Sequence, residues 1–213
     1  MDRRRFCFLP WIGGLPGIIV GEMSQLSLFG AMAREPALAD IEGLLAGNGQ
    51  IVRRDDAARI SVVVGELWRV DVLVAEMQSV LGLSAEVGPA EAGTTVGTPW
   101  LSELRATADA WALGAVKCPP QGWSLDGSRL RWWCLASGWA DKGMYNLALG
   151  ANDEHAWLAV GSALSAVGVP GVLVGPRADG PAYRIVGRRR LARLLELIGD
   201  PPDGVPVDGW PQP

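Results

Sequence analysis

The sequence predicts an α+β fold made of two copies of an αββαββα unit, related by a pseudo-twofold axis. A short helix pattern rich in small residues occurs twice, at Asp40–Gly49 and at Leu130–Gly138. Each copy precedes the same order of strand-like and helix-like segments. Because there is no third copy, the pattern favours one internally duplicated domain over an open-ended solenoid.

The first unit is assigned to residues 40–114. Strand-like apolar runs predict strands, apolar residues spaced by three or four predict helices, and Gly82 is typical of a helix end. After a basic turn, the expected elements are a strand at Ile60–Val64, a helix at Trp68–Leu81, strands at Ala85–Val87 and Thr95–Thr98, and a helix at Leu101–Leu113.

The second unit is assigned to residues 128–199 by the same criteria, with Gly168 as the corresponding helix end. The expected elements after the short helix are a strand at Tyr145–Leu149, a helix at Glu154–Val167, strands at Val172–Val174 and Tyr183–Val186, and a helix at Arg188–Ile198.

The small residues of the first short helix predict a close helix–helix contact. Glycine inside a helix costs roughly 1 kcal/mol relative to alanine, so Gly43 and Gly47 require a compensating contact. A closely packed backbone provides one, because the distance between helix axes depends on the side chains at the contact. We therefore expect the two short helices to lie side by side at the pseudo-twofold axis.

Three segments lie outside the two units. Residues 1–39 are assigned to an N-terminal extension and arm, whose apolar start is too short and too broken by proline and glycine for a transmembrane helix. Tandem prolines in the linker, residues 115–127, favour an extended crossing between the units. The proline-rich tail, residues 200–213, is expected to lie over the surface or hang free. Trp123 and Trp210, in these segments, are the tryptophans expected to be available for contacts.

Composition excludes several classes of protein. With 49% hydrophobic and 20% charged residues, the chain can bury a core and is not a disordered chain. A net charge of −4 argues against a general nucleic-acid coat, because non-specific binding needs many cationic contacts to phosphates, but it permits a local basic face. Three well-separated cysteines and one histidine, His155, predict a reduced cytoplasmic protein without a zinc site and without a cofactor.

The two short helices and the element order that follows them resemble the LAGLIDADG homing-endonuclease fold, particularly its non-nuclease relatives, the WhiA-type sporulation regulators. The resemblance covers Asp40 to Gly199 and rests on element order more than on identity. In that family an acidic residue before the last glycine of each helix holds the divalent metals for DNA cleavage. Asn48 and Ser137 occupy these positions here. The resemblance thus implies a saddle-shaped domain without a metal site or nuclease activity.

Eight arginines are candidates for contact with DNA. The resemblance implies that the strands form a saddle on the duplex, which would place Arg59 and Arg184 on or beside it. The arginines at the start of the last helix would neutralise several phosphates, although cations there oppose the helix dipole and a solvated helix face is the plain alternative. The candidates are Arg53, Arg54, Arg59, Arg184, Arg188, Arg189, Arg190 and Arg193.

A five-residue segment in the arm, Gln25–Phe29, reads QLSLF. It resembles the pentapeptide by which polymerases and mismatch-repair proteins bind the bacterial sliding clamp. Leu28 and Phe29 would enter a hydrophobic pocket while Gln25 bonds at its rim, and such buried anchors carry most of a small interface's energy. The alternative is that the apolar residues form an edge strand or a lid on the domain. The complete motif is Gln25, Leu26, Ser27, Leu28 and Phe29.

These observations lead to three hypotheses about function. The first is a non-catalytic accessory protein of DNA replication or repair, tethered to the sliding clamp, whose duplicated domain contacts double-stranded DNA or another repair protein. The second is a WhiA-like DNA-binding transcriptional regulator; those regulators continue into a helix-turn-helix domain, whereas this sequence ends. The third is a divergent homing-type endonuclease that uses Asp55, Asp56 or Asp141, which we expect in solvated turns. None of the three requires a membrane.

Overall fold

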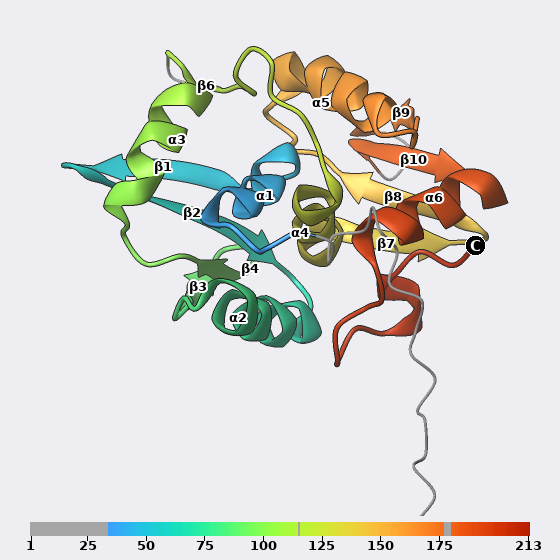
Figure 1. The fold of residues 1–213 in the computed structure, drawn as a ribbon, viewed down its shortest axis with the longest axis horizontal. Coiled ribbons are helices and arrows are strands. Elements are labelled where there is room, and N and C mark those ends of the chain that lie inside the picture. The colour runs from blue at the N-terminus through green and yellow to red at the C-terminus, as the bar shows by residue number, and fades with distance from the viewer. Residues whose placement is uncertain (1–33, 115, 177–179) are drawn as a thin grey trace, which may run out of the picture.

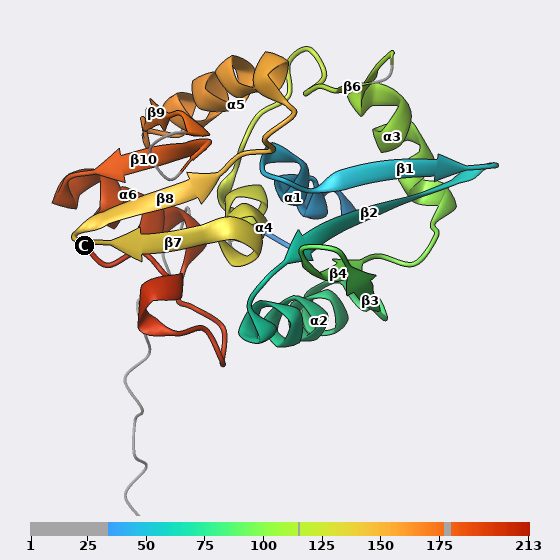
Figure 2. The ribbon, with the colours of Figure 1, turned by 180° about the vertical axis from the view of Figure 1, so that it is seen from behind.

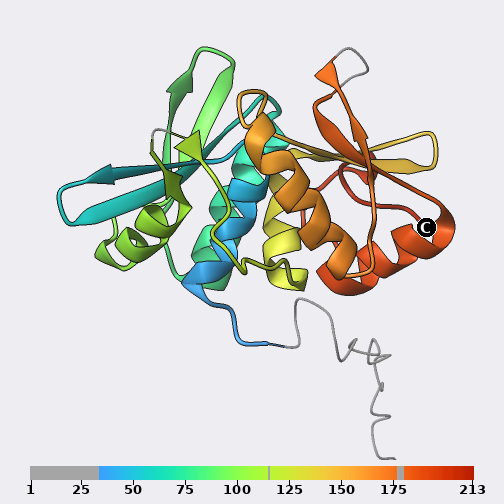
Figure 3. The ribbon, with the colours of Figure 1, turned by 90° about the horizontal axis from the view of Figure 1, so that it is seen from above.

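The fold was taken from a computed structural model that describes residues 34–114, 116–176 and 180–213. Two four-stranded antiparallel sheets flank a central pair of helices, which confirms the predicted α+β class (Figure 1). The strand orders, β1-β2-β4-β3 and β7-β8-β10-β9, are equivalent, as an internal duplication requires. Seen from above, the two sheets flare outward from the central helices (Figure 3).

The central pair consists of α1 (Gly43–Ala46), which continues a 3-10 turn at Leu38–Glu42, and α4 (Gly127–Ser137). A Cβ atom at Gly43 would lie 1.8 Å from the carbonyl oxygen of Arg129, so the two backbones are in direct contact. The predicted side-by-side packing is therefore confirmed. Helix α1 ends at Ala46, earlier than predicted, because Gly47 leaves the helical region with a ψ of −136°.

The first half follows α1 with seven elements. They are β1 (Gln50–Arg54), β2 (Ala57–Val64), α2 (Leu67–Leu81), β3 (Glu86–Ala90), β4 (Gly93–Gly97), a 3-10 turn at Ser102–Leu104 and α3 (Arg105–Trp111). The expected basic turn after Gly49 is instead the edge strand β1. The turn itself comes later, at Asp55, whose φ of 54° is in the left-handed region that aspartate tolerates.

The second half repeats this order after α4. Its elements are β7 (Gly138–Asp141), β8 (Met144–Ala148), α5 (Glu154–Ala166), β9 (Val172–Val174), β10 (Ala182–Val186) and α6 (Arg188–Ile198). Helix α4 begins at Gly127, three residues before its predicted start, because Asp126 caps it. An oxygen of the Asp126 carboxylate accepts a hydrogen bond from the backbone N–H of Arg129 at 2.9 Å.

The linker has more structure than tandem prolines predict. Two short strands, β5 (Ala112–Leu113) and β6 (Val116–Lys117), pair before the prolines and end the helix that was expected to reach residue 113. Trp123 is half-buried: its indole N–H donates to Glu42 at 3.1 Å, and its ring packs edge-on against Trp111 at 5.2 Å. The prediction that Trp123 is free was therefore wrong.

The C-terminal tail lies over the surface of the domain, which was one of the two predicted alternatives, and residues 209–211 are buried. Trp210, which follows a 3-10 turn at Val207–Gly209, is only 1% exposed, and its indole N–H donates to the carbonyl of Gly199 at 3.0 Å. The tail also contacts α2, since a Cβ at Gly209 would lie 2.9 Å from the Trp68 ring (Figure 2). The tail that follows the second half thus packs against helix α2 of the first half.

Candidate functional site

The C-terminal end of α1 is closed by a buried lysine. Lys117, from β6, donates from Nζ to the carbonyl oxygens of Gly47 and Gly49, both at 2.8 Å, and pairs with Asp153 at 2.8 Å. The side chains of Lys117 and Asp153 are only 6% and 12% exposed. The last carbonyls of a helix lack partners within it and carry the negative end of its dipole, so a cation is favourable there.

Burial governs the protonation of this lysine. Removal from water lowers the pKa of Lys117, and the hydrogen bond and charge of Asp153 only partly oppose that shift. His155 supports the strand behind the lysine, because its ring Nε2 lies 2.7 Å from the carbonyl oxygen of Lys117. Since that oxygen can only accept, the bond requires Nε2 to carry the proton. His155 is thus a hydrogen-bond partner of the backbone.

The C-terminal end of α4 is closed by a different buried cation. Arg69, from α2, donates to the carbonyl oxygens of Leu135 at 2.8 Å and Gly138 at 2.7 Å. Its remaining Nε pairs with Glu66 at 3.0 Å, and its guanidinium lies 4.3 Å from the centre of the Trp68 ring. Arginine suits this position because its planar fork reaches two carbonyls at once.

Asn48 and Ser137, at the positions where the resembling nucleases carry metal-binding acids, have structural partners instead. The amide of Asn48 donates to the carbonyl of Val63 at 3.2 Å, and the hydroxyl of Ser137 donates to the carbonyl of Trp133 at 3.4 Å. Within the described part of the chain, no three His, Cys, Asp or Glu side chains gather as metal ligands. The charged side chains that reach the two helix ends are the cations Lys117 and Arg69.

The acids considered as displaced catalytic groups lie away from the helix ends. Asp55 and Asp56 form the turn between β1 and β2, and Asp141 ends β7 at the following hairpin. Five strand residues separate Gly49 from Asp55, which corresponds to roughly 16 Å of extended chain. The carboxylates of Asp55 and Asp56 therefore lie far along the chain from Asn48.

The candidate arginines of the first half are already engaged. Arg53 pairs with Asp109 of α3 at 2.8 Å, and Arg59 pairs with Glu86 of β3 at 2.8 Å. Arg54 lies over the Trp100 ring, 4.3 Å from its centre. Arg54 and Arg59 share one face of the sheet by register, whereas Arg53 points to the opposite, helix-covered face.

The candidate arginines of the second half divide into two groups. Arg184 donates to Asn146 at 2.9 Å, and Arg193 pairs with Glu196 at 2.9 Å. The other three, Arg188–Arg190, are exposed at the start of α6 and line a shallow hollow with Val186 and Gly187. No carboxylate among the described residues pairs with these three, which we call the arginine edge. It lies at the outer end of the second half, where β10 passes into α6 (Figure 1).

The clamp-like segment, Gln25–Phe29, lies outside the described residues, so its conformation stays a prediction. The described chain begins nearby at Arg34, whose guanidinium pairs with Asp40 and, at 3.3 Å, with Asp126. These two carboxylates lie at the N-terminal ends of the two central helices. The arm therefore joins the domain on its helix side, away from the sheets (Figure 3).

The two buried cations have little signal in the sequence. Lys117 lies in a linker near two prolines, and Arg69 lies in a helix that also carries Asp71 and Glu76. Both donate hydrogen bonds to carbonyl oxygens that are far away in the sequence. Composition and periodicity do not reveal such contacts. The one available hint was the scarcity of lysine in a chain where arginine is the usual cation.

Comparison with known proteins leaves the family open. No protein-family profile matches the chain, and a search of curated proteins finds no match. Among solved structures, mesophilic variants of the homing endonuclease I-DmoI share 12% identity, with a TM-score of 0.44 over 75% of this chain and 96% of that chain. At that identity and score, the fold assignment rests on the sheet topology described above. The described helices include none with the length and apolar character of a membrane span.

Proposed function

We propose that the chain is a non-catalytic accessory protein of DNA replication or repair. In this proposal Gln25–Phe29 recruits it to the bacterial sliding clamp, and the duplicated domain contacts double-stranded DNA. The absence of catalysis is proposed from one observation. Lys117 and Arg69 bind the carbonyl groups at the C-terminal ends of both central helices. Cleavage with divalent metals requires carboxylates that hold the ions against the phosphate, and these helix ends present cations and carbonyls instead.

The arginine edge supports contact with DNA. Three exposed cations, Arg188–Arg190, follow one another without an acidic partner among the described residues, in a protein whose net charge is −4. Cations at the start of a helix oppose its dipole, so local stability does not account for them. Phosphates of a nucleic-acid backbone satisfy such a cluster and release condensed counterions, which favours binding at low salt.

The placement of the arm is compatible with simultaneous binding of clamp and DNA. Arg34 anchors the arm beside the N-terminal ends of the central helices, whereas the arginine edge lies at the outer end of the second half (Figure 3). The attachment point of the arm and the arginine edge therefore lie at different places on the domain. This separation favours a tethered accessory protein over a regulator that binds DNA alone.

Calorimetry with purified clamp tests recruitment. A short peptide must order its backbone on binding, so we expect a dissociation constant in roughly the micromolar range. Replacing Leu28 and Phe29 together by alanine should abolish the heat signal without changing the melting temperature. Ser27→Ala, in the same segment, is the matched control and should retain most of the affinity. No binding at about tens of micromolar by the intact protein would remove the clamp from the proposal.

Incubation with supercoiled plasmid tests the absence of cleavage. We expect no nicking above background in Mg²⁺ or Mn²⁺. Nicking that disappears on substitution of Asp55, Asp56 or Asp141 would instead support the divergent-nuclease hypothesis. Sequence-specific duplex binding without any affinity for the clamp would support the WhiA-like regulator.

A further inference from the structure

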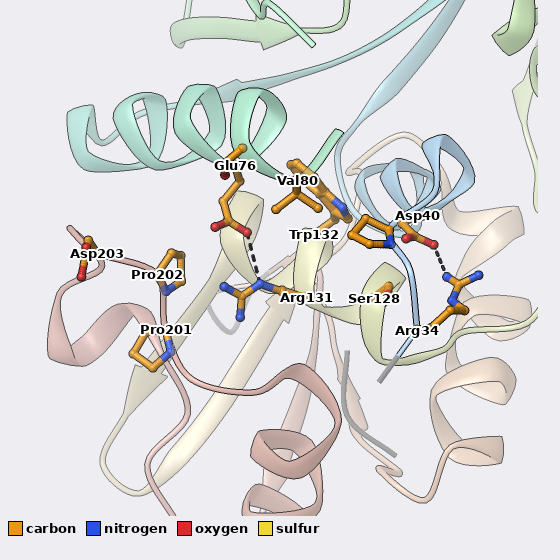
Figure 4. Close-up of a pocket in the computed structure, with 12 residues that line it drawn as sticks. Arg34, Asp40, Glu76, Val80, Ser128, Arg131, Trp132, Pro201, Pro202 and Asp203 are labelled. Atoms are coloured by element: carbon orange, nitrogen blue, oxygen red, sulfur yellow. Dashed lines mark hydrogen bonds and ion pairs between the residues drawn. The ribbon is translucent and has the colours of Figure 1, made fainter. Parts of the chain in front are cut away.

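A cavity of about 610 Å³ lies between helix α2, helix α4 and the C-terminal tail (Figure 4). Its apolar walls include Val80 of α2, Trp132 of α4, and Pro201 and Pro202 of the tail. Pro36, near the start of the described chain, lines another side. A volume of this size accommodates a small molecule or a few side chains of a larger partner.

Both arginines that line the cavity are bound to protein oxygens. Arg131 pairs with Glu76 at 3.2 Å and donates to two backbone carbonyls, at the end of α6 and the start of the tail. Arg34 is shared between Asp40, which lines the cavity, and Asp126. An anionic ligand would therefore have to compete with carboxylates and carbonyls that already occupy these cations.

The carboxylates of the lining outnumber the arginines. Asp203, on the tail side of the cavity, is exposed and has no ion-pair partner among the described residues. Two arginines stand against three carboxylates, those of Asp40, Glu76 and Asp203, so the lining carries one negative charge in excess. Opposite charges attract more strongly near a protein surface than in bulk water, so the cavity favours a cation over an anion.

The tail extends this surface along α2. A Cβ atom at Gly204 would lie 3.5 Å from the side chain of Val72, and one at Gly209 would lie 2.9 Å from the ring of Trp68. The contacts thus move toward the start of α2 as the tail proceeds, which means that the two segments run side by side in opposite directions. Together they form one continuous surface that leads from the cavity to the N-terminal end of α2.

This surface exposes apolar and acidic side chains. Leu67 on α2 and Val207 on the tail are 77% and 79% exposed. Asp71, one helical turn after Leu67, and Asp208, next to Val207, are exposed and have no ion-pair partner among the described residues. The tail contains no lysine or arginine, and Arg69, the one cation of α2, is buried. We call this surface the α2–tail face; it consists of the cavity and the exposed side chains Leu67, Asp71, Asp203, Val207 and Asp208.

We propose that the α2–tail face is a docking surface for a basic segment of a partner protein. Cations of that segment pair with the three free carboxylates, and its apolar side chains cover Leu67 and Val207 and enter the cavity. From Leu67 to Ser79, α2 is about 18 Å long, a length that roughly six residues of extended peptide cover. A single small cation would leave most of this length uncovered, and a nucleic acid would be repelled by the carboxylates. The docking requires neither the clamp nor DNA.

Fluorescence anisotropy on the full-length protein tests the docking. The probe is a labelled nine-residue peptide containing three arginines, three leucines and three serines, and we expect a dissociation constant of about 1–100 μM. Asp203→Asn together with Asp208→Asn should weaken binding by about three- to tenfold, because exposed ion pairs contribute modestly. The matched control, Glu103→Gln together with Glu154→Gln, removes the same number of exposed charges elsewhere and should leave the affinity unchanged.

A blocked cavity tests the apolar part of the docking. Ser79→Trp provides the block, because Ser79 is exposed on α2 and lines the cavity. It should weaken binding of the probe by about tenfold or more, the loss expected when one leucine side chain is no longer buried. Gln78→Trp, at the adjacent exposed position outside the lining, is the control and should bind as the wild type does. A second probe, with serine in place of each leucine, should bind weakly to all three proteins.

Three results would overturn the proposal. The first is no binding of the leucine-containing probe at about 1 mM. The second is equal affinity of the Ser79→Trp and Gln78→Trp proteins, or equal weakening by the two pairs of carboxylate substitutions, which would show general attraction to a protein of net charge −4. The third is displacement of the probe by an equal concentration of spermidine, which would assign the face to a small polycation instead of a peptide.

Discussion

The two halves of the molecule repeat one topology but distribute positive charge differently. In the first half, Arg53 and Arg59 pair with carboxylates and Arg54 lies over Trp100. In the second half, Arg188–Arg190 are exposed and have no carboxylate partner among the described residues. The two halves thus share a backbone topology. The first half has carboxylates and a tryptophan that engage its arginines, whereas the arginine edge of the second half has no such partners among the described residues and can attract an anion.

The C-terminal ends of the two central helices also differ, in the residue that binds their carbonyl groups. Lys117 closes the end of α1 from the linker, and Arg69 closes the end of α4 from the preceding half. Equivalent carbonyls are therefore satisfied by different residue types from non-equivalent elements. The same electrostatic requirement is thus met at the two helix ends by different residues.

The largest expected effect is at the contact between the halves. Gly43→Ala places a Cβ 1.8 Å from the backbone oxygen of Arg129, which only a separation of the central helices would relieve. We expect a loss of more than about 3 kcal/mol in the free energy of unfolding, measured by urea denaturation. Gly65→Ala, where no atom lies within 4 Å, is the control and should change stability by less than about 1 kcal/mol. Equal losses would contradict the close packing.

Loss of the lysine cap should be nearly as severe. Lys117→Met leaves Asp153 and the carbonyls of Gly47 and Gly49 without their cation, and breaking a buried pair in this way costs about 3–5 kcal/mol. Lys142→Met, at an exposed lysine, should be near neutral. Adding Asp153→Asn to Lys117→Met should cost less than the sum of the two single changes. Strict additivity would show that the pair is not coupled.

The charge contrast between the halves predicts a moderate difference in DNA affinity. Replacing Arg188, Arg189 and Arg190 by alanine should weaken duplex binding by about 10- to 100-fold and lower the salt slope by about two to three. Fluorescence anisotropy at several salt concentrations measures both. The matched variant replaces Arg53, Arg54 and Arg59 and should have the smaller effect, because their charges are already engaged. The reverse order would assign DNA contact to the first half.

The smallest expected effect concerns the thiol at the contact between the halves. Burial raises the pKa of Cys134 to about 12, above its ordinary value of 9.0. The unfolded chain therefore loses its proton first, so stability is fully present below pH 9 and falls as pH rises toward 12. Between pH 9 and 11 the wild type should lose up to about 2 kcal/mol more than Cys134→Ala, in urea titrations under reducing conditions. Parallel pH profiles would contradict this assignment.

The sequence predicted the parts of the fold that depend on local patterns. Helix α6 and strand β9 have their expected bounds, and Gly43 meets α4 as its small size implied. The wrong predictions concern segments whose structure depends on contacts with residues far away in the sequence. Trp210 looked free in a proline-rich tail, yet the tail folds back to place it in the core. Strand β1 was predicted to be a basic turn because it lacks alternating apolar residues. It forms at the edge of the sheet by pairing with β2.

The candidate site was less predictable than the fold. Asn48 and Ser137, at the ends of the two short helices, were readable directly from the sequence. Arg69 acts across the boundary between the halves and Lys117 acts from the linker, and neither has a local signature in the sequence. Likewise, the pairing of Arg53 and Arg59 depends on Asp109 and Glu86, whose proximity only the folded sheet establishes.

Sedimentation of a fluorescent duplex in Mg²⁺ tests the proposal that a clamp-tethered domain holds DNA without cutting it. We expect the protein to shift the duplex to faster sedimentation and added clamp to shift it further. The second shift should be absent when Leu28 and Phe29 are both replaced by alanine, and the duplex should be recovered intact. Displacement of the duplex by the clamp, or its cleavage, would contradict the account.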